Sequence, residues 1–270
     1  MKTRICVAGV TGWTGSAVAR AVMASEDFEL AAGIARKRAE EDLGTVLGAA
    51  PLGVPLSADL ATALETPFDV LIDFTAPDSV KGRALSTLAA GRHVVIGTSG
   101  LTAADFSELE AAAIAHGVGV IAAGNFSITA ALAKHCALIA ARFLRSCEII
   151  DYAHAEKIDA PSGTTMELAE EIGAIRPSEL GMALDRIHGF PEARGARLGN
   201  TQVHSVRLPG FVISFETIFG LPHERLAIRH DAGSGAQPYV AGALLAAREA
   251  TKLKGLVRGL DTLLFREPLA

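Results

Sequence analysis

Short apolar runs alternate with amphipathic stretches over the first half of the chain. The runs are flanked by turn residues and predict buried strands, whereas the stretches between them have the periodicity of helices. The predicted strands are 4–9, 28–35, 69–74, 93–96 and 118–122, and the predicted helices are 13–24, 78–90 and 103–116. This alternation favours an α/β fold with a doubly wound parallel sheet of the Rossmann type.

The pattern changes after residue 124. A long helix is predicted from Ser127 to about Phe143, and the strands that follow come close together, which favours an α+β unit with a mixed, mostly antiparallel sheet. These strands are predicted at 146–154, 201–208, 211–220 and 225–230, with a helix near 164–173 and a last apolar helix at 238–249. We therefore expect one domain of residues 1–124 and 237–270, and a second of residues 125–236.

Composition narrows the class of protein. Half of the 270 residues are apolar and the net charge is −5, which argues against nucleic acid or an anionic membrane as a partner. The longest apolar stretches are interrupted by charge and no signal peptide is visible, so we expect a cytoplasmic protein. The three cysteines and eight histidines show no metal-ligand spacing, so no metal site is expected.

A glycine-rich turn joins the first predicted strand to the first predicted helix. It contains Gly9, Gly12 and Gly15 in the spacing GxxGxxG. Glycines at such a junction allow a tight turn, close approach of a pyrophosphate to backbone N–H groups, and close packing of helix on strand. We therefore expect a dinucleotide site; the alternative is an ordinary glycine-rich turn.

The end of the second predicted strand bears on the type of dinucleotide. An acidic residue there would bind the 2′-hydroxyl of NAD. The chain instead has Ala35 followed by Arg36, Lys37 and Arg38, and cations suit the 2′-phosphate of NADPH. The alternative is a solvated run of charge that is balanced by the acidic residues after it. We expect NADPH, with NADH as the other candidate.

Three further strand ends carry polar loops. They are Asp73–Pro77, Gly97–Gly100 and Ala123–Ser127. Ligands of doubly wound sheets bind at the carboxyl ends of the strands, so the first two loops should border the nicotinamide half of the cofactor. Each loop could also be a simple turn.

The stretch Asp151–Thr165, DYAHAEKIDAPSGTT, combines several reactive groups. The SGTT turn leads into a helical pattern, and a helix N-terminus with a hydroxyl cap is suited to bind an anion such as a carboxylate. Lys157 and His154 just before it could supply a cation and a titrating group. The sequence thus predicts a small anionic ligand beside an acid or base.

These motifs together resemble the dihydrodipicolinate reductase family over nearly the whole chain. The matching strings are VAGVTGWTG at 7–15, DFTAP at 73–77, GTSG at 97–100, GNFS at 124–127 and KIDAPSGTT at 157–165. The resemblance implies a Rossmann domain, an α+β domain that binds substrate and forms a homotetramer or homodimer, and a reduction of dihydrodipicolinate by NAD(P)H in lysine and diaminopimelate synthesis.

The resemblance also implies roles for individual residues. Lys157 and His154 would be catalytic, and His154 with Ser162, Gly163 and Thr164 would bind the substrate. The implied cofactor contacts are Gly9, Thr11, Gly12, Trp13, Thr14, Gly15, Arg36, Lys37, Phe74, Thr75, Gly97, Thr98, Asn125 and Phe126.

The substrate half departs from the family pattern. Ala153 replaces the first of two adjacent histidines, the one usually assigned as the general acid, and Glu156 stands where another histidine is common. The segment 213–215 also lacks the glycine and histidine, and the segment 233–235 the arginine, that are usual there in the family. Two alternatives therefore stay open: a divergent member that reduces another cyclic imine or an unsaturated carboxylate, and a non-catalytic NADPH-binding sensor.

Overall fold

The computed structural model describes residues 1–266 and divides into two compact units. The first unit contains Met1–Ile128 and the chain from Gly235 onward, and the second contains Thr129–Ser234. Residues 267–270, which belong to the first domain predicted from the sequence, lie outside the described residues. The second unit is thus an insertion between two parts of the first.

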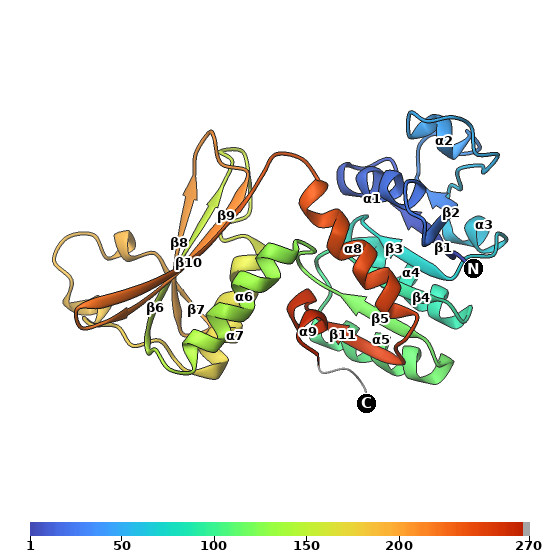
Figure 1. The fold of residues 1–270 in the computed structure, drawn as a ribbon. Helices are drawn as coiled ribbons and strands as arrows, with labels where there is room; N and C mark the ends of the chain where they lie inside the picture. The colour runs from blue at the N-terminus through green and yellow to red at the C-terminus, as the bar shows by residue number, and fades with distance from the viewer. Residues whose placement is uncertain (267–270) are drawn as a thin grey trace. The chain divides into compact units, whose positions relative to one another are not determined.

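The first unit is built on a six-stranded parallel sheet in the order β11-β5-β4-β3-β1-β2 (Figure 1). The strands are β1 (Thr3–Ala8), β2 (Phe28–Ile34), β3 (Val70–Asp73), β4 (His93–Ile96), β5 (Gly119–Ala122) and β11 (Gly255–Arg258). The helices are α1 (Trp13–Met23), α2 (Leu43–Val46), α3 (Leu60–Leu64), α4 (Pro77–Ala89), α5 (Ala103–His116), α8 (Gln237–Ala250) and α9 (Leu260–Leu264). The doubly wound fold predicted from the sequence is confirmed.

Helices cover both faces of this sheet. The pair α1 and α8 packs together, with α8 against β3, β4 and β5, and the pair α4 and α5 packs together against the same strands and β11. The central strands read as continuous apolar runs because both of their faces are buried. Ile5, Val7, Leu71 and Val95 accordingly have no exposed surface.

The sequence pattern does not predict the sixth strand, β11. Gly255–Arg258 pairs in parallel with Gly119–Ala122 and extends the sheet at its edge. Its four residues, GLVR, contain only two apolar side chains, so its strand character depends on the pairing with β5. The helix α8 that precedes it agrees with the predicted helix at 238–249.

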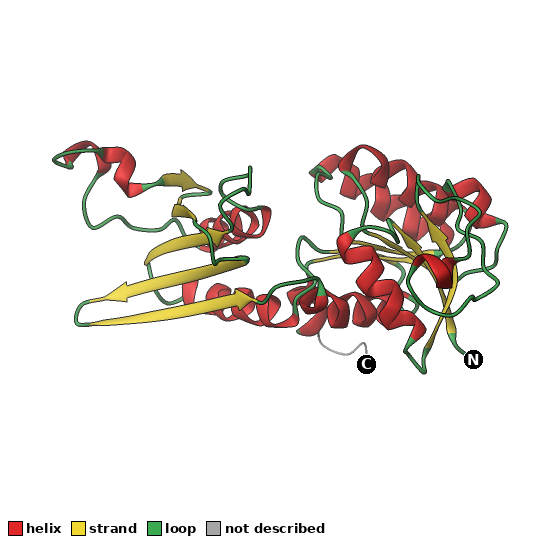
Figure 2. Ribbon diagram, turned by 90° about the horizontal axis from the view of Figure 1, so that it is seen from above, coloured by secondary structure: helices red, strands yellow, loops and turns green. Residues whose placement is uncertain are grey.

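The second unit contains a five-stranded mixed sheet in the order β10-β9-β6-β8-β7. Its strands are β6 (Ser146–Ala153), β7 (Ala196–Leu198), β8 (Thr201–Arg207), β9 (Ile213–Leu221) and β10 (Glu224–Ala232). Only the β6–β8 pair is parallel. The helices α6 (Ile128–Ala141) and α7 (Gly163–Ile175) lie beside this sheet (Figure 2), and two short 3₁₀ helices, Leu184–Arg186 and Pro191–Arg194, precede β7. The predicted α+β character is confirmed.

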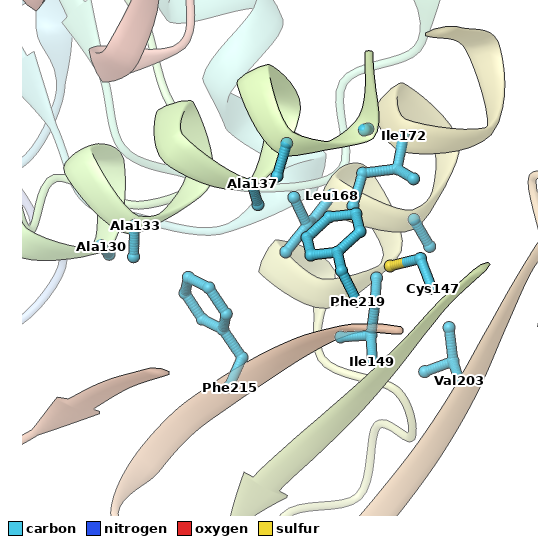
Figure 3. Close-up of a cluster of buried hydrophobic side chains, with 13 residues drawn as sticks. Ala130, Ala133, Ala137, Cys147, Ile149, Leu168, Ile172, Val203, Phe215 and Phe219 are labelled. Carbon is cyan, nitrogen blue, oxygen red and sulfur yellow. The ribbon is translucent and has the colours of Figure 1, made fainter. Parts of the chain in front are cut away.

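A single apolar cluster joins the two helices to the sheet in the second unit (Figure 3). Phe215 and Phe219 of β9 meet Leu168 and Ile172 of α7 and the alanines of α6. Strand residues alternate between faces, so the odd-numbered residues of β6 point toward the helices. This alternation places Asp151, with which the stretch Asp151–Thr165 begins, and Ala153 in the interior.

Candidate functional site

A cavity of about 1170 Å³ opens in the first unit at the carboxyl ends of β1, β2 and β3. This is the edge at which doubly wound sheets bind nucleotides. Residues of α3 and α4 complete its walls. The lining residues include Gly9, Thr11, Gly12, Ala35, Arg36, Lys37, Asp59, Phe74, Thr75, Asp78, Ser79, Gly82, Arg83 and Ser86.

The three glycines of the first turn serve different purposes. Gly9 has a positive φ of 78°, and a Cβ there would meet the Phe74 carbonyl oxygen at 2.2 Å. A Cβ on Gly15 would lie 2.1 Å from the Gly9 carbonyl oxygen, so Gly15 lets α1 pack on the turn. Gly12 lines the cavity, and a Cβ there would find only the Gly9 oxygen nearby, at 3.1 Å. Gly12 thus leaves backbone accessible to a phosphate, whereas Gly15 lies behind the turn and does not line the cavity.

The three cations after β2 separate into two groups. Arg36 and Lys37 line the cavity with exposed side chains. Arg38 instead has a positive φ of 67° and forms an ion pair with Glu41, with its Nη2 2.7 Å from the carboxylate. Two cations are therefore available to a cofactor phosphate in this cavity, and the third is already paired.

The three polar loops at the ends of β3, β4 and β5 lie against one another. The rings of Phe74 and Phe126 pack edge to face with centroids 5.7 Å apart. A Cβ on Gly97 would fall 2.1 Å from the Phe74 ring, which explains the glycine at that position. The Thr98 hydroxyl accepts the Thr75 backbone N–H at 2.8 Å. The structure therefore brings together the residues of three separate motifs.

A buried ion pair supports these loops, and it was not predicted. The Asp73 carboxylate is inaccessible to solvent and accepts a hydrogen bond from Arg83 at 2.5 Å. It also accepts the hydroxyls of Thr75, at 2.6 Å, and of Thr98, at 2.9 Å. Asp73 lies inside the DFTAP motif. Its partner Arg83 belongs to no motif, and in the sequence it resembles any solvent-facing arginine of an amphipathic helix.

Seven of the predicted cofactor residues do not line the cavity: Trp13, Thr14, Gly15, Gly97, Thr98, Asn125 and Phe126. Trp13 is 57% exposed and packs its ring against Tyr239 of α8, with centroids 5.8 Å apart. The Asn125 side chain accepts the backbone N–H of Ser127 at 2.8 Å and so fixes the loop after β5. Thr14 lies in the first turn of α1. Cofactor contacts for these residues stay predictions.

The SGTT turn of the second unit begins α7, but the expected hydroxyl cap is wrong. Ser162 occupies the N-cap position without capping the helix through its side chain. Its hydroxyl donates to Asp151 at 2.7 Å and its backbone N–H donates to the same carboxylate at 2.9 Å. Ser162 is consequently only 5% exposed. Gly163 and Thr164, which follow it in the first turn, reach the surface.

The residues expected to carry charge at this turn form two local pairs. The Lys157 ammonium donates to Asp159 at 2.5 Å, and the Lys157 side chain is 18% exposed. Partial burial alone would raise the pKa of Asp159, but hydrogen bonds, chiefly from Lys157, outweigh it and lower that pKa. The His154 Nδ1 atom lies 3.2 Å from a carboxylate oxygen of Glu156, whose side chain is well exposed. Lys157 thus faces a carboxylate that stays ionised.

Two further findings concern the described residues. Among residues 1–266, no group of three or more His, Cys, Asp or Glu side chains is placed to hold a metal ion. None of the helices in that range has the length and apolar character needed to cross a membrane.

Comparison with known proteins identifies the family. The family described as dihydrodipicolinate reductase, N-terminus, matches residues 3–126, and dihydrodipicolinate reductase, C-terminus, matches residues 126–264. The chain belongs to the dihydrodipicolinate reductase family. The resemblance carried by the sequence motifs is thereby confirmed, and the family is one of NAD(P)H-dependent oxidoreductases.

Members of the dihydrodipicolinate reductase family match the chain over nearly its full length. The 4-hydroxy-tetrahydrodipicolinate reductase of Desulfitobacterium hafniense is 38% identical over 97% of this chain and 99% of its own. That of Geobacillus thermodenitrificans is 37% identical over 98% of this chain and 100% of its own. A dipicolinate-bound dihydrodipicolinate reductase from Paenisporosarcina sp. TG-14 superposes with a TM-score of 0.84, at 30% identity, over 97% of this chain and 100% of its own.

Proposed function

We propose that this chain reduces 4-hydroxy-tetrahydrodipicolinate to tetrahydrodipicolinate, with loss of the 4-hydroxyl group as water and with NADPH as the preferred hydride donor. The observation that carries the proposal is the near full-length match to reductases of that name. The first unit would bind the cofactor and the second unit the substrate. The product would serve lysine and diaminopimelate synthesis.

The cofactor cavity fits a dinucleotide phosphate. Gly12 leaves the backbone of the first turn open, and the backbone N–H groups at the start of α1 face an anion favourably. Arg36 and Lys37 would hold the 2′-phosphate, which favours NADPH over NADH. Phe74 and Thr75 would border the nicotinamide. Bound NADPH supplies the hydride, and the protein's part is to orient it.

The second unit would bind the substrate by electrostatic attraction. An anionic substrate would place a carboxylate at the first turn of α7, against Gly163 and Thr164, because the helix dipole favours negative charge there. Apart from its chain neighbours and the backbone of its own helix, no heavy atom of the described residues lies within 4 Å of the position that a Cβ would take on Gly163, so there is room for a ligand at this point. A substrate contact by Ser162, whose donors face Asp151, stays a prediction.

The proton that completes the reduction would come from Lys157 or His154, or from water. Ala153, which stands where the family resemblance implies a histidine, is fully buried and has no titrating group. Lys157 is the stronger candidate, since its ammonium is held by Asp159 and would also stabilise negative charge that develops on the substrate. His154 would contact the substrate from the same loop.

Turnover of NADPH tests the proposal. The purified protein should oxidise NADPH in the presence of freshly generated 4-hydroxy-tetrahydrodipicolinate. Tight NADPH binding without turnover would reject the proposed reaction. Ala153 would explain such a result, because alanine cannot donate a proton. Turnover restored by another cyclic imine would then indicate a divergent reductase, whereas no turnover with any imine would indicate a sensor.

Cofactor preference can be tested by the cations after β2. The double substitution Arg36→Ala, Lys37→Ala should raise the KM for NADPH about tenfold or more, because charge-assisted contacts to the 2′-phosphate are lost. The KM for NADH should change little. Arg38→Ala is the matched control, since Arg38 pairs with Glu41 and does not line the cavity. A parallel rise in both KM values would contradict the assignment of these cations to the 2′-phosphate.

We further propose that the protein is a homotetramer or homodimer of the cytoplasm. The sheet of the second unit has partly exposed apolar residues, Ile150 and Ile218, on the face opposite the buried Phe219. Sheets with such a face and open edges often pair across subunits. Light scattering of the purified protein measures the oligomeric state.

A location in the cytoplasm suits the three free cysteines, Cys6, Cys136 and Cys147, because thiols stay reduced there.

A further inference from the structure

A buried ion pair lies directly beside the first turn of α7. The Asp151 carboxylate is inaccessible to solvent, and Arg207 of β8 donates to it at 2.7 Å. The same carboxylate accepts both donors of Ser162 and the hydroxyl of Thr165, the latter at 3.0 Å. Burial alone would raise the pKa of Asp151, but these hydrogen bonds outweigh it and hold that pKa below its ordinary value. The protein therefore keeps a negative charge of its own at the N-terminus of this helix.

Arg207 has a second contact on the loop that carries Lys157. Its guanidinium donates to the backbone oxygen of Asp159 at 2.7 Å. The side chain of Asp159 in turn accepts the Lys157 ammonium at 2.5 Å. One arginine thus connects the start of α7, through Asp151, with the loop that presents the proposed proton donor.

This arrangement has an electrostatic consequence. The positive end of α7 attracts an anion, but an unpaired Asp151 carboxylate would already satisfy it and would repel a second negative charge. Coulomb interactions are strong where water is excluded. The buried carboxylate of Asp151 would therefore repel an anion that binds at the first turn of α7. Arg207 cancels the charge of Asp151 and leaves the first turn attractive to an external anion.

We infer that Arg207 is a positioning residue for the substrate: it neutralises Asp151 so that the first turn of α7 accepts a carboxylate, and it fixes the loop that presents Lys157. This inference rests on the proposed function, because it takes Gly163 and Thr164 as the contacts of a substrate carboxylate. Arg207 does not itself contact the substrate; it acts through Asp151 and Asp159.

The first measurement is substrate affinity in Arg207→Met. We expect the KM for 4-hydroxy-tetrahydrodipicolinate, and the Kd for dipicolinate measured by calorimetry with NADPH present, to rise about tenfold or more, because a buried carboxylate loses its partner. The KM for NADPH should stay within about twofold, since the cofactor cavity lies in the other unit. Arg207→Lys should restore most of the affinity because it keeps the charge.

The decisive variant adds Asp151→Asn to Arg207→Met. Asparagine has the shape of aspartate, and the hydroxyls of Ser162 and Thr165 can reverse to accept its amide, because a hydroxyl both donates and accepts. Removing the uncompensated charge should return the Kd for dipicolinate to within about threefold of the wild type. If the double variant binds as weakly as Arg207→Met or more weakly, the role of Arg207 is purely structural and the inference is overturned.

Further controls keep the test interpretable. Arg194→Met removes a different arginine, one that pairs with Glu148 on the opposite face of β6, and should leave the Kd for dipicolinate unchanged.

If Arg207→Met does not fold, Asp151→Asn alone decides the question. The Kd of Asp151→Asn for dipicolinate should stay at or below the wild-type value, and a tenfold rise overturns the inference. A wild-type protein that neither binds dipicolinate nor turns over would instead refute the proposed function. Normal turnover with unaltered binding in the folded arginine variants would refute the inference only.

Discussion

Replacing Lys157 by alanine is expected to slow the reduction step about a hundredfold to ten-thousandfold, which is the usual contribution of a positioned general acid. Alanine offers neither a proton nor a positive charge, and the neighbouring Ala153 cannot substitute for it. NADPH should bind with unchanged affinity, because the cavity of the first unit is untouched. Single-turnover kinetics, started by mixing substrate with the enzyme–NADPH complex, measure this step apart from product release.

The control for this variant is Lys252→Ala. Lys252 also pairs with a carboxylate, that of Glu249 at 2.7 Å, but it lies exposed at the end of α8. Its removal should leave the single-turnover rate unchanged. If Lys157→Ala also reduces at the wild-type rate while NADPH still binds, the active site has been assigned to the wrong part of the chain. A large loss in His154→Ala alone would move the proton donor to the imidazole.

Replacing Asp73 by alanine is expected to lower the free energy of unfolding by about 3–5 kcal/mol, because it leaves the partly buried Arg83 without its counter-charge. The two threonine hydroxyls that donate to Asp73 would also lose their acceptor. Urea-induced unfolding of the purified variant measures the change. We expect NADPH affinity to fall as well, because Thr75 and its loop lie at the cofactor cavity.

Asp69→Ala provides the matched comparison for Asp73→Ala. Asp69 directly precedes β3 and pairs with Arg4 at 2.7 Å, but both side chains are more than a third exposed. Exposed pairs contribute little, because water and salt screen them. The loss for Asp69→Ala should therefore be much smaller than for Asp73→Ala. Equal losses would show that burial of the Asp73 pair is not what makes it important.

Local patterns in the sequence are sufficient to predict most of the strands of the first unit. Five of its six strands lie where apolar runs predict them, because a strand buried on both faces must be apolar throughout. The glycines of the first turn are likewise determined locally, by backbone shape and close packing. The sequence does not predict β11 because this short segment becomes a strand only through pairing with Gly119–Ala122.

Long-range partners explain what the sequence did not reveal about the candidate site. The string SGTT predicts a helix start correctly, yet it does not show that Asp151, from a strand earlier in the chain, takes both donors of Ser162. Similarly, three consecutive cations look equivalent in the sequence. Only the structure separates Arg38, which pairs with Glu41, from the two that line the cavity. In each case the deciding contact comes from the folded chain and not from the motif.

The insertion of the second unit has a consequence for biosynthesis. Residues 129–234 leave the ribosome as one continuous stretch, whereas α8 and β11, which cover and extend the parallel sheet, are translated after them. A nascent chain that ends near residue 234 therefore carries every strand of the inserted unit, but the part before that unit still exposes one apolar face of its sheet. Such exposed surface is prone to aggregation. We expect the segment before the inserted unit to need chaperone protection until α8 and β11 have been made, although it is translated before both.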